Sequence, residues 1–188
     1  MMLKETESST REQIVRVAMD LIQTRSYLGF SFQDIADRVG IRKASLYHHF
    51  ASKESLGVEV LQTAMQGFND WTATTPKSPQ KKLDAYFSLY RKELRAGQAV
   101  CPAGAFAPGW DCANDDLRAA ASELRNTQIQ WLTEVLGGMD LKQPAGSLDQ
   151  LAVFVFAVCQ GALTSARMTE NVAEFDITIA QLKTLLAR

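Results

Sequence analysis

Apolar side chains recur along the chain at intervals of three and four residues, the spacing that places them on one face of an α-helix. The segment from Arg11 to Arg25 shows the pattern clearly, with apolar residues at Ile14, Val17, Ala18, Leu21 and Ile22. No alternation with a period of two residues lasts long enough to indicate a strand. The sequence therefore predicts an all-α protein of about nine helices.

Serine residues stand directly before three of the amphipathic segments, at Ser9, Ser31 and Ser52. A serine in this position accepts a hydrogen bond from a backbone amide in the first helical turn, which otherwise has no partner inside the helix. Helices are therefore expected to begin just after each of these serines.

The second and third predicted helices are short, over about 32–39 and 43–49, and a tight turn at Gly40 joins them. Glycine adopts the left-handed backbone conformation at little cost, so Gly40 is suited to end the first of the two. Two short helices joined in this way are typical of a helix-turn-helix, in which the second helix enters the major groove of DNA.

The third predicted helix lies in a positively charged segment of a nearly neutral chain. The formal net charge is −1, yet no acid occurs between Arg38 and Lys53. Attraction to phosphate depends on where charge is placed, so this segment favours contact with a polyanion. The outward positions of the helix are small or polar, as approach to base edges requires: Lys43, Ala44, Ser45 and His48. Leu46 and Phe50 are expected to anchor the helix to its neighbours.

The stretch FSFQDIADRVGIRKASLYHHFASKESL, residues 30–56, closely resembles the DNA-binding segment of the TetR (tetracycline-repressor) family. The elements in register are Phe30, Ser31, Ile35-Ala36, Gly40-Ile41, Leu46-Tyr47-His48-His49-Phe50 and Lys53-Glu54-Ser55-Leu56. The resemblance covers about residues 10–60. The chain departs from the family at Ser26, where the family often has glycine at a turn.

The resemblance implies a fold with three parts. These are a helix-turn-helix DNA-binding domain over residues 1–52, a connecting helix over 53–73, and a helical ligand-binding and dimerisation domain over 74–188. The family pattern further implies a homodimer through the last two helices. It favours a repressor that a small-molecule effector releases from a palindromic double-stranded DNA operator.

Residues carried over by position assign roles at the DNA. The side chains expected to face bases or sugars are Lys43, Ser45 and His48, and those expected to hold phosphates are Ser31, Gln33, Tyr47 and Lys53. Arg42, at the start of the recognition helix, suits either role. His49 is expected to support the helix from behind.

The remaining two thirds of the chain carry weaker signals. Helices are expected over about 81–96, 117–136, 147–168 and 175–186, with at most a short helix in 97–114. Two prolines in TTPKSPQ, residues 74–80, mark the domain boundary.

Aromatic residues concentrate in the middle of the chain, where they could form either core or the wall of an effector pocket. An apolar or amphipathic small molecule is the expected effector. The expected pocket residues are Tyr86, Tyr90, Cys101, Phe106, Trp110 and Trp131.

Three cysteines, an odd number without zinc-ligand spacing, make neither a disulfide framework nor a metal site. Cys101 precedes Pro-Ala-Gly, and a thiol at a helix N-terminus is more reactive because the dipole favours the thiolate. An oxidant- or electrophile-sensing repressor, using Cys101 with Cys112, is therefore an alternative to the ligand-responsive one. The other interpretation is that Cys101 and Cys112 are inert, buried thiols.

Other function classes find little support in the sequence. It has no phosphate-binding loop, no dinucleotide glycine pattern and only two histidines, which are adjacent, so neither an enzyme nor a cofactor is expected. A helical small-molecule-binding protein without a DNA role remains a remote alternative. Residues 1–10 are polar, and the longest apolar run, Leu151–Cys159, is far shorter than the about 20 residues that cross a bilayer. The expected location is the cytoplasm.

Overall fold

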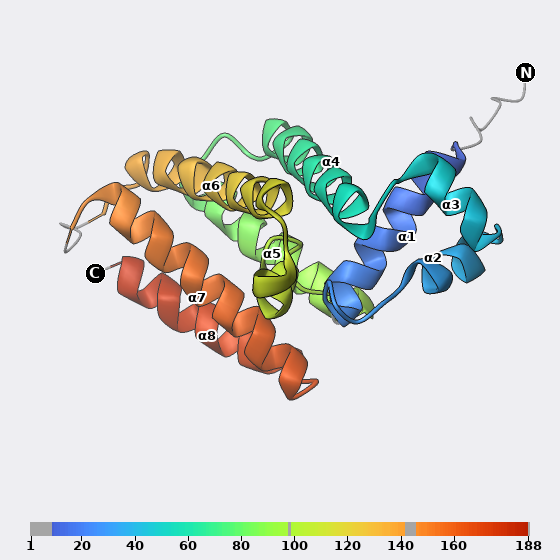
Figure 1. The fold of residues 1–188 in the computed structure, drawn as a ribbon. Helices are drawn as coiled ribbons and strands as arrows, with labels where there is room; N and C mark the ends of the chain where they lie inside the picture. Colours follow the sequence, from blue (N-terminus) through green and yellow to red (C-terminus); the bar gives the residue numbers. More distant parts are fainter. Residues whose placement is uncertain (1–8, 98, 142–145, 188) are drawn as a thin grey trace, which may run out of the picture.

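The computed structural model describes residues 9–97, 99–141 and 146–187. Within those ranges the chain forms eight α-helices, one 3-10 helix and no strand, which confirms the all-α prediction (Figure 1). The elements are α1 (Thr10–Arg25), α2 (Phe32–Val39), α3 (Lys43–His49), α4 (Lys53–Ala73), α5 (Pro79–Gly97), η1 (Gly104–Cys112), α6 (Asp115–Gly137), α7 (Leu148–Met168) and α8 (Val172–Leu186). Residues 1–8, on which the expectation of a cytoplasmic location partly rests, lie outside these ranges.

The predicted caps and turn of the N-terminal helices are confirmed. Ser9, Ser31 and Ser52 each accept a hydrogen bond from the amide three residues on, at 3.3, 3.4 and 3.1 Å. Gly40 has a φ of 78°, in the left-handed region, and its amide donates to the carbonyl of Ala36 at 2.9 Å. The helix-turn-helix thus has the local geometry that its sequence predicts.

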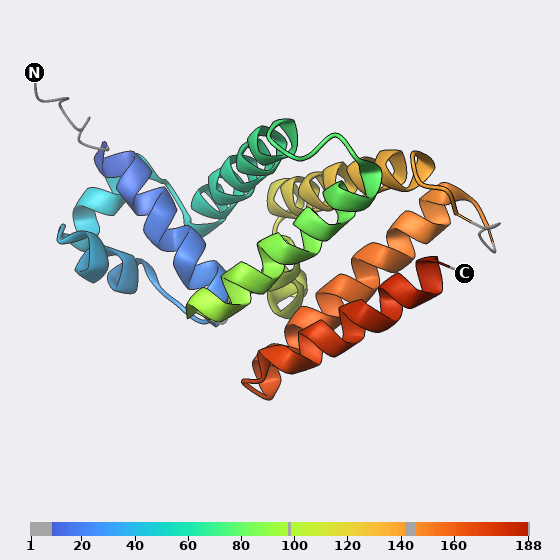
Figure 2. The ribbon, with the colours of Figure 1, turned by 180° about the vertical axis from the view of Figure 1, so that it is seen from behind.

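Helices α1 to α3 form one end of the molecule and α5 to α8 the other, while α4 runs from the first group toward the second (Figures 1 and 2). The first apolar core is not closed by α1 to α4 alone. Phe106 of η1 stacks on Tyr27, with ring centroids 5.0 Å apart, and Leu117 of α6 is buried in the same cluster. The first apolar core therefore contains residues from both sides of the predicted boundaries at residues 52 and 73. The division of the chain at these residues stays a prediction.

The second core lies among α5 to α8, and α7 packs against both α6 and α8. Helix α7 has 21 residues and a mean hydropathy of 1.5 over its most apolar window, so length and composition alone would allow it to cross a membrane. Its inner side chains, among them Val155, Cys159 and Leu163, are fully buried in this core. The packing favours a core helix over a membrane span.

The C-terminal end of α1 is tied to the body by hydrogen bonds. Arg167 of α7 donates to the carbonyl of Gln23 at 3.0 Å and also to the carbonyl of Thr24. Gln23 and Val100 bond to each other twice, from the Gln23 amide side chain at 3.1 Å and from the Val100 backbone amide at 3.2 Å. These bonds place α1 relative to α7 and to the segment that precedes η1.

Two glycines predict opposite effects of the same substitution. Gly40→Ala should lower the free energy of unfolding by about 1 kcal/mol, because a side chain is strained at a φ of 78° although its Cβ would meet nothing within 4 Å. Gly67→Ala, inside α4 and equally free of contacts, should raise that free energy by up to about 1 kcal/mol through better helix propensity. Urea unfolding at fixed protein concentration measures both, and equal effects of the two changes would contradict the account.

Candidate nucleic-acid interface and effector cleft

Helix α3 is held on the first core by two buried side chains. Leu46 is fully buried and Phe50, which follows the helix, is 3% exposed, so the predicted anchors are confirmed. The guanidinium group of Arg11 lies 4.3 Å from the centre of the Phe50 ring and covers its outer side. With one side fixed in this way, the opposite side of α3 faces solvent.

The exposed arc of α3 carries the side chains that were predicted to meet DNA. Lys43 and Tyr47 lie one turn apart on it, and Ala44 and His48 form the neighbouring row, all four exposed. Ser45 lies at the edge of the arc and is half-buried. Arg42 is exposed just before the helix, and His49 is half-buried on the inner side.

The Tyr47 ring is positioned from below, while its hydroxyl remains free. The ring centroid lies 5.2 Å from that of Phe32, which is buried at the start of α2. More than half of Tyr47 is exposed, at 54%, and its hydroxyl has no hydrogen-bond partner among the described residues. A rigid ring with a free hydroxyl can donate a hydrogen bond to a phosphate oxygen.

Ion pairs divide the basic residues of the first four helices into two groups. Three arginines are paired with acids: Arg11 with Glu59, Arg25 with Asp34 and Arg38 with Asp20. In the described ranges, no acid lies within 4.0 Å of Arg42 or Lys43. Arg16 of α1 is likewise unpaired in the described ranges, but only Arg42 and Lys43 are adjacent, and they place two unneutralised charges at the start of α3, available to a phosphate backbone.

Ser31 and Gln33 lie exposed at the first turn of α2, and both already bond to acids of their own helix. The Ser31 hydroxyl donates to the Asp34 carboxylate at 2.7 Å, and the Gln33 amide donates to Asp37 at 2.7 Å. The hydrogen bonds from Ser31 hold the pKa of Asp34 below its ordinary value. A phosphate contact by either side chain would have to replace or share these bonds.

Lys53 is turned toward the protein rather than toward solvent. Its ammonium group donates to the carbonyl of Phe30 at 2.5 Å and lies 4.1 Å from the centre of the Phe30 ring and 4.8 Å from that of Tyr27. Partial burial lowers the pKa of Lys53 from its ordinary value. In this arrangement Lys53 fixes the turn before α2 to the start of α4.

The six residues predicted to line an effector pocket do not share one cavity. Tyr86, Tyr90 and Cys101 do lie together, around the buried amide of Gln128. The Tyr90 hydroxyl donates to the Gln128 oxygen at 2.5 Å, and the Tyr86 hydroxyl donates to the same atom at 3.3 Å. Burial raises the pKa of both tyrosines well above the ordinary value, so both hydroxyls stay protonated donors.

Of the other three predicted pocket residues, Trp131 contacts this cluster, with its ring centroid 5.8 Å from that of Tyr86, whereas Phe106 and Trp110 lie elsewhere. Phe106 belongs to the first core against Tyr27, and Trp110 is 40% exposed on the surface of η1. Trp131 packs in an aromatic cluster, with its ring centroid 5.5 Å from that of Trp71. The turn of 3-10 helix directs the Phe106 and Trp110 side chains away from the tyrosines, and spacing along the chain did not predict that direction.

A cleft of about 300 Å³ opens where α1, α4, α5 and α6 converge. Its walls include Phe68 and Trp71 of α4, and Tyr90 with Gln128 of the tyrosine cluster also lines it. Of the predicted pocket residues, Tyr90 is among its lining residues and the other five are not. The lining that sequence reasoning missed includes Met19, Gln23, Gly67, Glu93 and Pro102. Gly67 was the available signal, because glycine inside a helix weakens it unless space is needed there.

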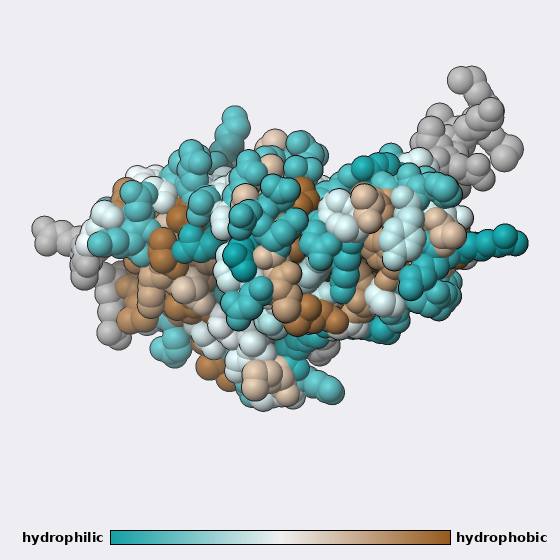
Figure 3. Space-filling view, viewed as in Figure 1, coloured by the Kyte–Doolittle hydropathy of each residue, from teal (hydrophilic) through white to brown (hydrophobic). Residues whose placement is uncertain are grey.

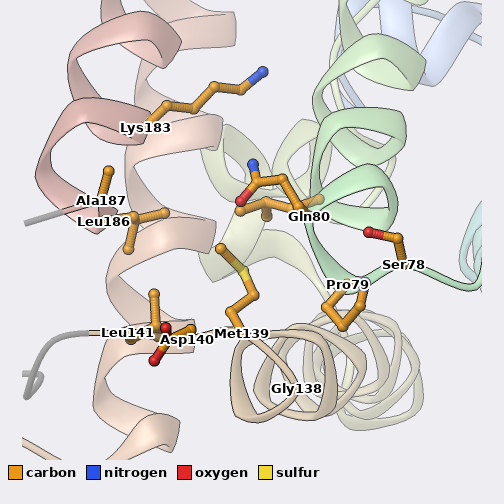
Figure 4. A pocket seen from close by; sticks show the side chains of 11 residues that line it. Ser78, Pro79, Gln80, Gly138, Met139, Asp140, Leu141, Lys183, Leu186 and Ala187 are labelled. Atoms are coloured by element: carbon orange, nitrogen blue, oxygen red, sulfur yellow. The ribbon is translucent and has the colours of Figure 1, made fainter.

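A second cavity, of about 550 Å³, lies at the other end of the body, between the start of α5, the end of α6 and the end of α8 (Figure 4). Gln80 and Met139 extend into it from opposite sides (Figure 4). Lys183 on its rim is engaged in an ion pair with Asp84, 2.6 Å between the charged atoms. The helix ends that line this cavity are remote from α3 (Figure 1).

The two thiols of the alternative sensor mechanism differ in surroundings. Cys101 is fully buried in the second core, with its sulfur 3.6 Å from the Tyr90 hydroxyl. It precedes η1 by three residues, so it does not stand at the start of a helix. Cys112 is exposed at the end of η1, and both thiols are free. This geometry does not favour a thiol switch over a ligand-responsive one.

Comparisons with known proteins identify the same segment as the sequence did. Residues 14–60 match the family model of bacterial regulatory proteins of the tetR family. The HTH-type transcriptional repressor DhaR from a Mycobacterium species is 29% identical over 171 residues, which is 86% of this chain and 84% of that protein. The repressor KstR2 from Mycolicibacterium smegmatis is 36% identical over 102 residues, which is 50% of this chain and 48% of that protein.

Solved structures extend the similarity to nearly the whole chain. A TetR-family regulator from Agrobacterium tumefaciens matches with a TM-score of 0.86 and 26% identity, over 95% of this chain and 98% of that one. A TetR regulator from Legionella pneumophila matches with a TM-score of 0.84 and 26% identity, over 96% and 99%. With the helix-turn-helix geometry, the family-model match and these relatives together, the chain belongs to the TetR family of helix-turn-helix transcriptional regulators.

Proposed function

We propose that the protein is a repressor that binds a palindromic DNA operator as a homodimer and releases it when a small molecule occupies the cleft between α1, α4, α5 and α6. The observation that carries the DNA role is the exposed arc of α3 with its unpaired Arg42 and Lys43. A helix that is anchored on one side and basic on the other can enter a major groove without disturbing the core.

Uncharged faces of α7 and α8 support the homodimer. The exposed positions of α7 from Gln150 to Ser165 carry no charge, and Val153 and Phe154 are 40% and 46% exposed. On α8, Ile177 and Leu185 are 63% and 56% exposed. Apolar surface lies over α7, whereas α2 and α3 are largely hydrophilic (Figure 3). A second copy would cover both faces in a four-helix bundle.

A symmetric dimer would present two copies of α3 to one side of a duplex. Recognition helices separated by about one helical turn, about 34 Å, read two half-sites of an inverted repeat. The operator is therefore proposed to be palindromic. A DNA-bound role places the protein in the cytoplasm.

Contacts between the cleft and the DNA-binding helices support control by a ligand. Gln23 of α1 lines the cleft and also receives the Arg167 hydrogen bond at its carbonyl. Phe68 and Gly67 line it from α4, whose first turn adjoins α3. A ligand that fits the cleft better in one arrangement of α1 and α4 would change the separation of the two α3 helices, at a coupling free energy of about 1–3 kcal/mol.

Substitutions on α3 test the DNA role. Lys43→Ala should weaken operator binding by about 1–3 kcal/mol and relax the preference at the contacted base. It should also reduce the slope of log binding constant against log salt concentration by about 1, because one fewer counterion is released. Tyr47→Phe should weaken binding to all sequences by about 1 kcal/mol, since one phosphate hydrogen bond is lost. Titrations with an operator selected from a random duplex pool, at several salt concentrations, measure both effects.

Lys92→Ala is the control for the α3 variants. Lys92 is exposed on α5 and, among the described residues, has no acid within 4.0 Å. The Lys92→Ala variant loses the same positive charge at a position far from α3, so its operator affinity should equal that of the parent protein. The assignment of α3 fails if Lys43→Ala and Tyr47→Phe bind as tightly as this control.

A charge placed on the apolar face tests the homodimer. Phe154→Glu should produce a monomer and lower operator affinity at least tenfold, because two carboxylates would face each other across the symmetric interface with no partner. Asn69→Glu, an exposed change on α4, adds the same charge and should remain dimeric. Sedimentation equilibrium distinguishes the two, and a dimeric Phe154→Glu variant would rule out this interface.

A further inference from the structure

The cleft between α1, α4, α5 and α6 has an unusual balance of charge. The charged side chain that lines it is Glu93, an acid, and no lysine or arginine lines it among the described residues. In those residues no cation lies within 4.0 Å of the Glu93 carboxylate either. Glu93 is half-buried, so its charge acts on the cleft with less screening than a fully exposed acid.

Three aromatic side chains, Phe68, Trp71 and Tyr90, line the cleft together with this acid, and the rings of Trp131 and Tyr86, outside the lining, connect them. Phe68 and Trp71 have ring centroids 5.6 Å apart, and Trp71 is 5.5 Å from Trp131. The Tyr90 ring lies 5.0 Å from that of Tyr86, and its hydroxyl donates to Gln128. The faces of tryptophan and tyrosine rings attract cations, most strongly where water is excluded. The three lining rings and the acid thus favour the same kind of ligand charge.

The polar end of the cleft does not oppose this preference. The Gln128 oxygen accepts hydrogen bonds from both tyrosine hydroxyls, and its amide nitrogen lies 3.5 Å from the Cys101 sulfur. Burial keeps both hydroxyls protonated and neutral. An anionic ligand would meet the Glu93 carboxylate here without a compensating lysine or arginine, and would be disfavoured.

We propose that the cleft binds a small lipophilic cation, an aromatic or alkyl ammonium compound, through the Phe68–Trp71–Tyr90 wall and the Glu93 carboxylate. The volume of about 300 Å³ lies at the small end of ligand pockets and sets the size of the compound. This assignment depends on the proposed function in one respect only, namely that the bound compound is the effector. The preference for positive charge follows from the cleft itself.

A pair of compounds of equal shape tests the charge preference on the intact protein. Phenyltrimethylammonium and its neutral isostere tert-butylbenzene differ in one nuclear charge, and 4-tert-butylbenzoate supplies an anion. Calorimetric titration should give at least about tenfold tighter binding of the cation than of the isostere, and the weakest binding for the anion. Equal affinity for the first two compounds, or tighter binding of the anion, overturns the proposal.

Two variants locate the binding in this cleft. Glu93→Gln should lower affinity for the cation by about tenfold and leave tert-butylbenzene unchanged, whereas Glu134→Gln, an exposed acid of α6 outside the cleft lining, should change neither. Gly67→Leu should abolish binding of both compounds because its side chain would extend into the cleft from a position with no contacts within 4 Å. A urea midpoint for Gly67→Leu that is not lower than that of the parent establishes that its fold is intact. Retained cation binding in Gly67→Leu overturns the location.

Operator release is measured separately from ligand binding. The proposal together with the proposed function expects phenyltrimethylammonium to release operator DNA from the parent protein and not from Gly67→Leu. Cation binding that depends on Glu93 without any operator release would refute the effector role and leave the ligand class supported. Release by tert-butylbenzene at the same occupancy as by the cation, with equal affinities, would refute the ligand class and leave the repressor mechanism supported.

Discussion

Helix α4 is buried in two different apolar cores, and the arrangement of the molecule depends on this double burial. Leu56, Val60 and Leu61 belong to the first core, below α1 to α3, while Phe68 belongs to the second. A helix is stiff over its length, so neither core can move without moving or bending the segment they share. The orientation of α3 is therefore coupled to the packing of α5 to α8, although α3 contacts none of those helices closely.

Most of the helices and the exposed arc of α3 could be predicted from the sequence, because their signals are local. A capping serine, a left-handed glycine and apolar residues at helical spacing act within a few residues of one another. The exposed arc of α3 followed from Leu46 and Phe50, since anchoring one side of a helix determines the other. The position of the Lys53 side chain has no such local signal. Its position over Phe30 and Tyr27 depends on a turn more than 20 residues away, which no local pattern describes.

The cleft between α1, α4, α5 and α6 could not be predicted in the same way, because it forms between helices that are distant in sequence. The sequence left open whether Tyr86 and Tyr90 form core or pocket wall, and the structure has both buried. Whether Phe106 turned toward these tyrosines or toward Tyr27 depended on the path of the chain before η1. That path is held by the two hydrogen bonds between Gln23 and Val100, which lie 77 positions apart in the sequence. The sequence composition shows that aromatic residues are concentrated in this region. Hydrogen bonds between distant residues determine which of them line the cleft.

Energy scales indicate where a ligand could act on this arrangement. Allosteric coupling of about 1–3 kcal/mol is comparable to one or two hydrogen bonds at about 0.5–1.5 kcal/mol each. The end of α1 is held by such bonds, from Arg167 and between Gln23 and Val100, and they adjoin the cleft through Gln23. Separating Phe106 from Tyr27 would instead open a close-packed core, at a cost of about 3–5 kcal/mol for a ring of this size. The hydrogen bonds at Gln23 are therefore weaker than the aromatic packing at Phe106, so the end of α1 can be displaced at a lower free-energy cost than the first core can be opened.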